Sequence, residues 1–590
     1  MSSKKIKSGH FALRKILLAY LGLNLLLYVI SIILTEGKYA YSLDDSYIHL
    51  SIADNLANRG LFSVTGRDFE AASSSIFYSL LLTVIRLLIT DFDLYVLSPI
   101  AINHVFNLLI IKFFYDRCKE LQISESRSII ISLLSVVLIP TINNPFIGME
   151  HAIQTYLALQ LLNTSIAQIT TNDGKHWPIS LYLLAFLSTG FRYEAFFLIA
   201  PIVFLFLFNR KYLIAIGIAA ASLIPNVWFA IYSSQHGGMI IPNSILIKTI
   251  NKQYLASDSP IMDAIFLIGN LIWNMISGFP LVYGIVIVVM LVFNQIPIEE
   301  ANKSPLIGRL LKMLEAISKD EWLSACFIFS IASIGHVLTA RMLWFFRYES
   351  YLLAILYYLG IVFAMRLNYF DRLYEYFQVK FFSLFRITQA KNKMQDQEKK
   401  QDSGALEVNT NDKFYKLFAV LFVILLVRGL ICIVQIPLAS RNIYQQQYMM
   451  GQFVSKYYNN RSVAANDIGA INLFNDAYIL DLVGLSNTEV AEFRMNRNYT
   501  TSTLEYLMEK YNISIAIIYE YWFSGTYDFL PRRPDSWIKV GEWTINLRVI
   551  SDRETVSFWA IHPEDVRELK ANLVDFESSL PQEVKVAYFI

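Results

Sequence analysis

Apolar runs of about twenty residues recur along this chain, and they constrain its fold more than any other feature. The first run, from about Ile16 to Leu34, is long enough to cross the roughly 30 Å hydrocarbon core of a bilayer. It follows five basic residues, and no small-residue cleavage site ends it, so we predict a retained helix. Hydrophobic residues make up 55% of the 590 positions and charged residues only 17%. So little charge cannot cover a soluble domain of this size, and the sequence predicts a polytopic membrane protein.

Basic residues near the ends of these runs predict how the chain threads the membrane. The positive-inside rule puts the basic N-terminus in the cytoplasm, so the loop that opens at Glu36 is expected to be external. Continuing this alternation of cytoplasmic and external loops predicts about eleven transmembrane helices. The first three lie at 16–34, 94–115 and 128–143, the fourth starts at about 152, and the fifth and sixth form a tight pair that meets at 191–194. The remaining five lie at 212–233, 261–293, 322–340, 350–365 and 414–437. The apolar segment 75–89 is short, and counting it as a span would invert every later loop. We therefore expect it to be a helix lying at the external interface.

A polar stretch divides the chain into two parts. Residues 366–413 include QAKNKMQDQEKKQDSG, a composition typical of a low-complexity linker, here on the cytoplasmic side. We assign residues 1–437, linker included, to a transmembrane domain, and residues 438–590 to an external domain. That tail mixes short β-prone runs (SIAIIYEYW, WTINLRVI) with helix-like stretches. The predicted fold is mainly α and polytopic, with a C-terminal external α/β domain.

Two adjacent carboxylates, Asp44 and Asp45, follow the first predicted span. They start a helix-like pattern in which Ile48, Ile52 and Leu56 recur every four residues. One interpretation is that the pair caps this helix and complements its dipole. Capping needs only one short polar side chain, however, and neighbouring carboxylates repel each other. A pair is more useful where a proton must be removed or a cation held, and both interpretations stay open on the residues alone.

Charged side chains also gather in the other external loops. Charges close to the hydrocarbon are costly unless they are paired or functional. Arg192 with Glu194, and Arg347 with Glu349, could be purely structural ion pairs. Several cations on one face, beside paired carboxylates, instead favour a site for an anionic lipid head group, for which arginine is the natural phosphate clamp. The candidate cations are Arg192, Lys248, Arg341 and Arg347.

Several classes of protein are disfavoured by missing motifs. The chain has no GxxxxGK[ST], GxGxxG, HExxH or GxSxG motif, which argues against a nucleotide-driven pump and a soluble-type nucleotide-sugar enzyme. The three cysteines have no metal-ligand spacing, and His49, His104 and His151 do not form a ligand set. We therefore predict no metal site, although a divalent ion beside the aspartate pair is left open. No nucleic-acid partner is expected.

A set of motifs in a fixed order resembles the GT-C superfamily of integral-membrane glycosyltransferases. The chain reads DDSYIHLSIADNLANRGLF from Asp44, then GMEH, RYEA, PNSILIKT and VAANDIGAINLF. These are similar to DDAYIHLRYARNLAxGHGL, GMET, RPEG, PNTFYAKT and VAVNDIGAIGYF in the branch that contains the mycobacterial terminal arabinofuranosyltransferase. Protein O-mannosyltransferases and the aminoarabinose transferases of lipid A are more distant relatives. Ser51 and Asp54 stand where the branch often has arginine, so a donor contact by that arginine is not carried over.

The resemblance implies an inverting glycosyltransferase in the bacterial inner (cytoplasmic) membrane, with its active site facing the periplasm or exterior. It would move a sugar, such as the pentofuranose arabinofuranose, from a polyprenyl-phosphate donor to an envelope glycan, lipid or protein, with no further cofactor. One of the aspartate pair, Asp44 in the first instance, would be the base. The four candidate cations would bind the donor phosphate, and further contacts to substrate would come from His49, Glu150, Glu194, Asn243, Asn466 and Asp467.

Two alternatives from other classes stay in view. A multi-pass transporter or flippase of lipid-linked substrates would show inverted repeats and charges near the membrane midplane. We find no convincing repeat, and the charges cluster at helix ends. A lipid-linked oligosaccharide transferase or ligase is a nearer alternative, because it could use similar external carboxylates with a different donor.

Overall fold

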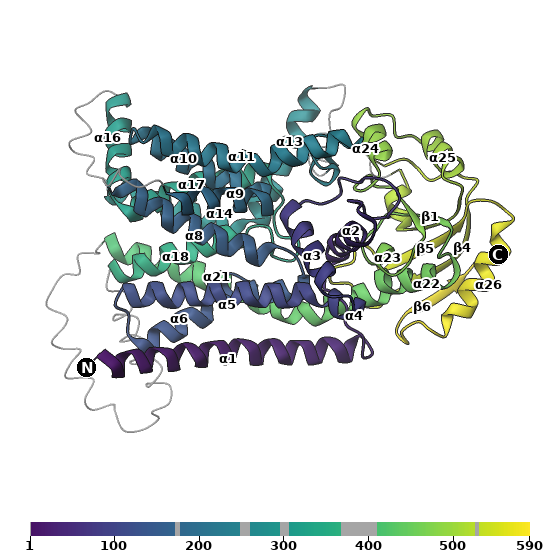
Figure 1. The fold of residues 1–590 in the computed structure, drawn as a ribbon, viewed down its shortest axis with the longest axis horizontal. Coiled ribbons are helices and arrows are strands. Elements are labelled where there is room, and N and C mark those ends of the chain that lie inside the picture. The colour runs from purple at the N-terminus through teal and green to yellow at the C-terminus, as the bar shows by residue number, and fades with distance from the viewer. Residues whose placement is uncertain are drawn as a thin grey trace.

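The apolar segments of the sequence form a bundle of long helices, and the tail forms a domain around a mixed sheet (Figure 1). The computed structural model describes residues 2–171, 178–247, 260–295, 306–366, 410–525 and 530–589. Apart from residues 366 and 410–413, the predicted linker 366–413 lies outside the described residues.

The helices of the bundle follow the predicted segments closely. They are α1 (Ser2–Leu34), α5 (Ser98–Glu120), α6 (Glu125–Leu138), α8 (His151–Thr170), α9 (Ile179–Phe191), α10 (Phe196–Phe208), α11 (Tyr212–Gln235), α13 (Pro260–Ser277), α14 (Phe279–Gln295), α16 (Leu306–Lys319), α17 (Glu321–Thr339), α18 (Ser350–Arg366) and α21 (Thr410–Ile443). Short helical turns join some of them, namely α4 (Phe92–Val96), η1 (Thr141–Asn143), α7 (Asn144–Ile147) and η2 (Tyr193–Ala195).

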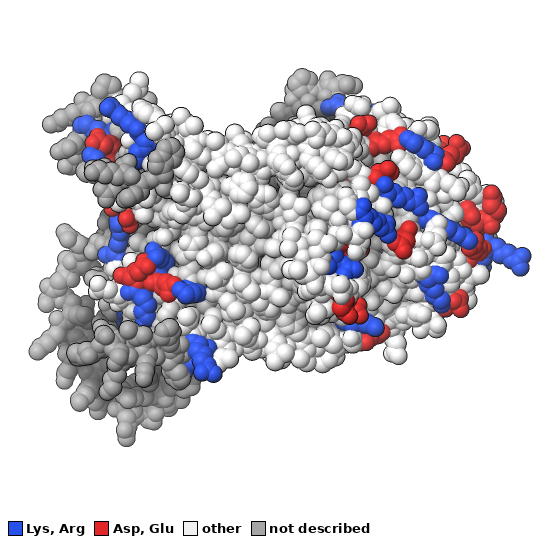
Figure 2. Space-filling view, viewed as in Figure 1, with Lys and Arg blue, Asp and Glu red and all other residues white. Residues whose placement is uncertain are grey.

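Among the described residues, five helical segments are long and apolar enough to cross a membrane: Leu13–Leu34, Phe92–Glu120, Tyr212–Gln235, Glu321–Thr339 and Lys416–Tyr457. Two bent pairs raise the number to seven if each pair is one span. The other predicted spans correspond to α8 and to the shorter helices α9, α10 and α18, so the count of eleven stays a prediction. Figure 2 shows an uncharged belt across the bundle, with charged side chains at one end and over the sheet domain. These features are compatible with a multi-pass membrane protein.

Two of the predicted spans are bent rather than straight. Pro140, which has a positive φ of 23°, follows α6, and the next helical turns leave at 66°. The predicted span 261–293 is two helices that meet at Gly278 with an angle of 85°. A Cβ at Gly278 would lie 2.2 Å from Cε of Met342, so a larger residue at the corner would have to displace the end of this side chain.

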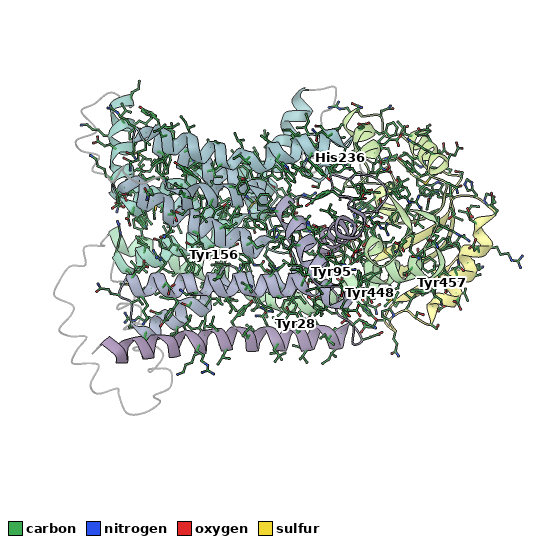
Figure 3. The ribbon with its side chains drawn as sticks, viewed as in Figure 1. Tyr28, Tyr95, Tyr156, His236, Tyr448 and Tyr457 are labelled. Atoms are coloured by element: carbon green, nitrogen blue, oxygen red, sulfur yellow. The ribbon has the colours of Figure 1, made fainter. Side chains whose placement is uncertain are left out.

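The last long helix does not end near Pro437, as the sequence analysis expected. Helix α21 continues to Ile443, passes through a π-helical turn η3 (Tyr444–Tyr448) and runs on into α22 (Met449–Tyr457). The position 437/438, where we divided the chain, therefore lies inside a continuous helix. Figure 3 places Tyr448 where the bundle meets the sheet domain.

The C-terminal domain is built on a six-stranded sheet with the order β2-β1-β3-β5-β4-β6. Its strands are β1 (Ser462–Ala465), β2 (Tyr478–Asp481), β3 (Ile513–Ile518), β4 (Ile538–Thr544), β5 (Thr555–Ala560) and β6 (Lys585–Tyr588). Strands β1, β2 and β3 are parallel, and the others pair antiparallel. Helical segments connect or cover them: α23 (Ala470–Leu473), α24 (Thr488–Met495), α25 (Thr501–Lys510), η4 (Glu520–Phe523) and α26 (Asp565–Glu577).

The β-prone run SIAIIYEYW contains most of β3, as predicted, whereas WTINLRVI is only partly a strand. Strand β4 ends at Thr544, and the chain then forms a loop before β5 begins at Thr555. The alternation of apolar and polar residues in WTINLRVI continues beyond the end of β4. Val549 and Ile550 are apolar because they pack against the helical bundle, not because they belong to the sheet. This loop carries Asp552 back toward the bundle.

Two helices lie between the bundle and the sheet domain, α2 (Asp45–Arg59) and α3 (Ile76–Leu88) (Figure 1). Helix α3 has 13 residues, about 20 Å at 1.5 Å per residue, which is too short to cross the hydrocarbon core. Helix α2 packs on α3 with one face and on α23 with another, so it connects both halves of the molecule.

Candidate functional site

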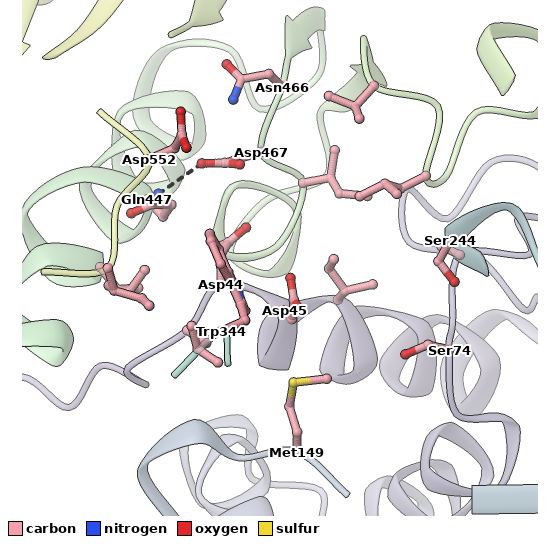
Figure 4. Close-up of a pocket in the computed structure, with 18 of the residues that line it drawn as sticks. Asp44, Asp45, Ser74, Met149, Ser244, Trp344, Gln447, Asn466, Asp467 and Asp552 are labelled. Atoms are coloured by element: carbon pink, nitrogen blue, oxygen red, sulfur yellow. Dashed lines mark hydrogen bonds between the residues drawn. The ribbon is translucent and has the colours of Figure 1, made fainter. Parts of the chain in front are cut away.

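A pocket of about 300 Å³ opens where the start of α2 meets the sheet domain (Figure 4). Its walls come from distant parts of the chain: the N-terminal end of α2, the loop before α18, the π-helical turn and the loops that follow β1 and β4. Four carboxylates and two guanidinium groups line it, namely Asp44, Asp45, Asp467, Asp552, Arg341 and Arg347.

Asp44 is held by the backbone of the sheet domain. Its two carboxylate oxygens accept hydrogen bonds from the backbone N–H groups of Gly469 and Ala470, each at 2.8 Å. A Cβ at Gly469 would lie 2.1 Å from the carbonyl oxygen of Asp44, so glycine is required for this approach. Burial, and then the negative charge of Asp467, raise the pKa of Asp44 to about 8. A carboxyl group with such a pKa is a suitable base near neutral pH.

Asp467 lies beside Asp44 and has fixed partners of its own. Its Oδ2 accepts a hydrogen bond from Nε2 of Gln447 at 2.9 Å, and burial raises its pKa to about 6. The neighbouring Asn466 accepts a hydrogen bond from the backbone N–H of Tyr519 through Oδ1. Its buried Nδ2 has no hydrogen-bond partner among the described residues, although Asn466 lines the pocket. Both residues therefore line the pocket, whereas their predicted contacts to substrate stay a prediction.

Asp45 forms an ion pair with Arg347, which is 1% exposed. The same guanidinium donates to the hydroxyl of Tyr348 at 3.0 Å and contacts Sδ of Met149. The sequence-based alternative paired Arg347 with Glu349, but Glu349 is the partner of Arg428. Arg347 therefore belongs to the carboxylate pair of α2 rather than to a local ion pair.

Arg192 lies in a separate buried network beside the pocket. Its Nη1 donates to Oε1 of Glu150 at 2.7 Å, and its Nε donates to Oε2 of Glu194 at 2.9 Å. The structural ion pair that the sequence analysis left open is thus present. Nε2 of His49 lies 3.7 Å from Oε2 of Glu150, and His49 lines the pocket. Two carboxylates already balance the charge of Arg192, which weakens it as a phosphate ligand.

Of the remaining predicted residues, only Arg341 lines the pocket. Its exposed side chain forms no ion pair with any residue that the structure describes, and it also lines a smaller neighbouring cavity with Arg192 and Glu194. Lys248 lies outside the described residues. Asn243 is fully buried and donates to Thr488 instead, whereas the adjacent Ser244 lines the pocket, and its Oγ has no described partner. Arg341 is therefore the cation best able to meet an incoming anion.

Sequence reasoning missed several residues of the pocket, among them Gln447, Asp552, Trp344 and Trp522. Asp552 accepts a hydrogen bond from Nε1 of Trp522 and lies on the loop after β4, where no motif marked it. Trp344 sits in a turn whose residues 343–346 all have positive φ, a strained backbone conformation that often occurs at functional sites. The sequence pattern that could have pointed to Gln447 is the run of three glutamines, 445–447, which follows the last predicted span.

No group of three or more histidine, cysteine, aspartate or glutamate side chains within the described ranges is arranged to hold an ion. The chemistry that the pocket can offer from its own residues is proton removal by a carboxylate, and stabilisation of an anion by guanidinium groups.

Comparison with known proteins adds one finding. A family model described as "Domain of unknown function (DUF8728)" matches residues 441–559. This range contains the π-helical turn, the NDIG segment and Asp552, so it includes the sheet-domain half of the pocket. No curated protein matches the chain. The match covers a minor part of the chain, and a functional assignment must rest on the pocket itself.

Proposed function

We propose that this protein is an inverting glycosyltransferase of the GT-C type, which transfers a sugar from a polyprenyl-phosphate donor to an envelope glycan, lipid or protein. One observation carries the proposal. Asp44, with its raised pKa, shares a pocket with Arg341 and Arg347, and this pocket lies where α2 meets the sheet domain, beside the helical bundle (Figures 1 and 4). A lipid-linked donor needs this combination, because its tail stays in the membrane while its phosphate and sugar reach polar residues.

The reaction requires one base and fixed positive charge. Asp44 removes the proton from an acceptor hydroxyl, and the acceptor oxygen attacks the anomeric carbon from the side opposite the phosphate. The bond between this carbon and the phosphate oxygen breaks, so polyprenyl phosphate leaves with the electron pair and the configuration inverts. Negative charge grows on the leaving phosphate, and the guanidinium groups of Arg341 and Arg347 stabilise it.

The surroundings of the two adjacent aspartates favour different roles. Asp44 is kept basic by burial and by Asp467, whereas Asp45 is paired with a buried guanidinium that stabilises its charged form. We therefore assign the base to Asp44. Asp45 holds Arg347 in place and contacts sugar hydroxyls, and Asn466 and Ser244, which line the pocket, offer further contacts to the sugar.

The proposed topology follows from charge. The basic N-terminal end of α1 lies at the end of the bundle opposite the pocket (Figure 1), and the positive-inside rule assigns that end to the cytoplasm. The pocket then faces the periplasm or exterior of a bacterial inner membrane, with about eleven spans and with α3 along the interface. A flipped lipid-linked donor would reach the pocket there without a nucleotide.

The test is transfer by purified protein in nanodiscs, with synthetic polyprenyl-phosphate sugars and envelope extracts as acceptor. Asp44→Asn should abolish transfer, because asparagine has nearly the same shape and cannot accept a proton from the acceptor, and thermal unfolding checks that the variant is folded. Asp535→Asn is a matched control, since this exposed aspartate lies outside both the pocket and its neighbouring cavities. Full activity of Asp44→Asn would end the proposal. Activity only with lipid-linked oligosaccharides would favour the transferase or ligase alternative.

A further inference from the structure

A second cavity, of about 480 Å³, lies on the other side of α2. Its walls are the exposed face of α2, the start of α4, helix α22 and the segment that follows α23. Amide, hydroxyl and carboxylate groups make up most of its lining, unlike the reaction pocket, where apolar residues are frequent. The mechanism above uses none of these residues.

The charges of this cavity favour a neutral ligand. Asp54, Asp93 and Asp476 line it, against the single guanidinium of Arg59. Arg59 is neutralised by an ion pair with Asp476, and Asp54 is paired with Arg86. Asp93 forms no ion pair with a described residue. A phosphate or another anion would therefore meet net negative charge and no available cation.

Aromatic rings stand next to these polar groups. Phe474 packs against Tyr448 with ring centroids 5.0 Å apart and against Phe92 at 6.4 Å, and all three line the cavity. Each ring is only partly buried, and the three rings add a small apolar area to a lining that is mostly polar. A sugar ring fits this mixture, because it presents apolar C–H faces to aromatic rings and hydroxyl groups around its edge to amides and carboxylates.

Several polar groups in the cavity have no partner of their own. Gln452 and Ser455 lie one turn apart on α22, and neither side chain forms a hydrogen bond with a described residue. Oδ1 of Asn472 is buried, and within the described ranges it also lacks a partner. Gln452 and Ser455 are half-buried at the cavity wall, so both side chains are available to hydrogen-bond a ligand, and the buried Oδ1 of Asn472 is an unsatisfied acceptor beside them.

Neighbouring residues of the same two segments line the two cavities. Gln447 lines the reaction pocket, and the next residue, Tyr448, lines the second cavity. Likewise, the segment 466–468 lines the first and 472–476 the second, and α23 separates them. A ligand bound beside α23 therefore sits one short helix away from the N–H groups that hold Asp44.

We propose that this second cavity is a binding site for a neutral glycan, which holds a non-reacting part of the acceptor. Its role as an acceptor site rests on the proposed function, whereas carbohydrate binding does not. The inference selects a neutral oligosaccharide or polysaccharide among the acceptor classes named above.

The experiment measures binding of the full chain in nanodiscs to an array of neutral, phosphorylated and sulfated oligosaccharides. The wild type should bind neutral oligosaccharides and not the anionic ones. Gln452→Ala combined with Ser455→Ala should raise the Kd about tenfold or more, because each substitution removes a hydrogen bond of about 1 kcal/mol. Gln582→Ala is the matched control, an exposed glutamine outside both cavities, and should bind as the wild type does.

Binding of no neutral oligosaccharide, a preference for anionic ones, or an unchanged Kd in the double variant would each overturn the inference. Thermal unfolding checks that the double variant is folded. If it is not, the near-isosteric Asp93→Asn at an exposed position provides the second measurement and should also weaken binding severalfold. Asp44→Asn separates the two proposals: it should bind the glycan normally. Intact binding without transfer by the wild type rejects only the proposed function.

Discussion

A methyl group at Gly469 would test whether the sheet domain positions the carboxylate of Asp44. In Gly469→Ala the new Cβ would lie 2.1 Å from the carbonyl oxygen of Asp44 and 2.5 Å from its Oδ2. An ordinary contact needs about 3.5 Å, so the two segments must separate by more than about 1 Å. The two N–H···O bonds of 2.8 Å would then lengthen to nearly 4 Å, beyond the range of a hydrogen bond.

The expected cost follows from these contacts. Overpacking costs about 1–3 kcal/mol, and hydrogen bonds to a charged group are worth about 1.5–3 kcal/mol each, so we expect destabilisation of at least about 3 kcal/mol. A base displaced by about 1 Å should also slow transfer on the order of a hundredfold. Chemical denaturation and sugar transfer in nanodiscs measure the two effects. Gly22→Ala is the matched control, because no atom lies within 4 Å of its added Cβ. Wild-type stability and transfer in Gly469→Ala would refute the reasoning.

Three further predictions follow from the pocket and its supports. The rate of transfer should rise with pH and level off above about 8, because protonated Asp44 cannot act as a base. Asp467→Asn removes a negative charge that raises the pKa of Asp44, so the rise in the rate–pH profile should move to lower pH. Arg341→Ala should change the free energy of unfolding by less than about 0.5 kcal/mol, as its side chain is exposed, yet raise the KM for the donor severalfold; an unchanged KM contradicts its role. Glu349→Ala leaves Arg428 buried without its partner and should lower the free energy of unfolding by about 3–5 kcal/mol, as a denaturant titration would detect.

Much of the helical bundle could be predicted from the sequence, since long apolar runs leave few alternatives to helices. The bends could not be predicted in the same way. At the corner, Gly278 packs against Met342, which lies 64 residues further along the chain. Hydropathy is equally high on both sides of the corner, so the segment 261–293 looked like one span.

The candidate site shows the same limit. Asp44, Asp45, Asn466 and Asp467 could be named because motifs mark them. The partner of Arg347 could not, because the nearest acid in sequence, Glu349, is not the nearest in space, and Asp45 is 302 positions away. Sequence spacing predicts ion pairs within a helix turn, whereas an ion pair between distant segments depends on how the whole chain packs.

The continuous helix that joins the two halves of the molecule has a mechanical consequence. The segment Lys416–Tyr457 has 42 residues, about 63 Å of helix, which is twice the thickness of the hydrocarbon core. The sheet domain is thus joined to the bundle by a continuous helix rather than by a flexible linker. The π-helical turn at Tyr444–Tyr448 interrupts the regular α-helical hydrogen bonding of this segment, and its residues line both cavities. Long helices bend most readily at such turns. A substrate that pushes the sheet domain away from Asp44 must therefore bend this helix at the π-helical turn.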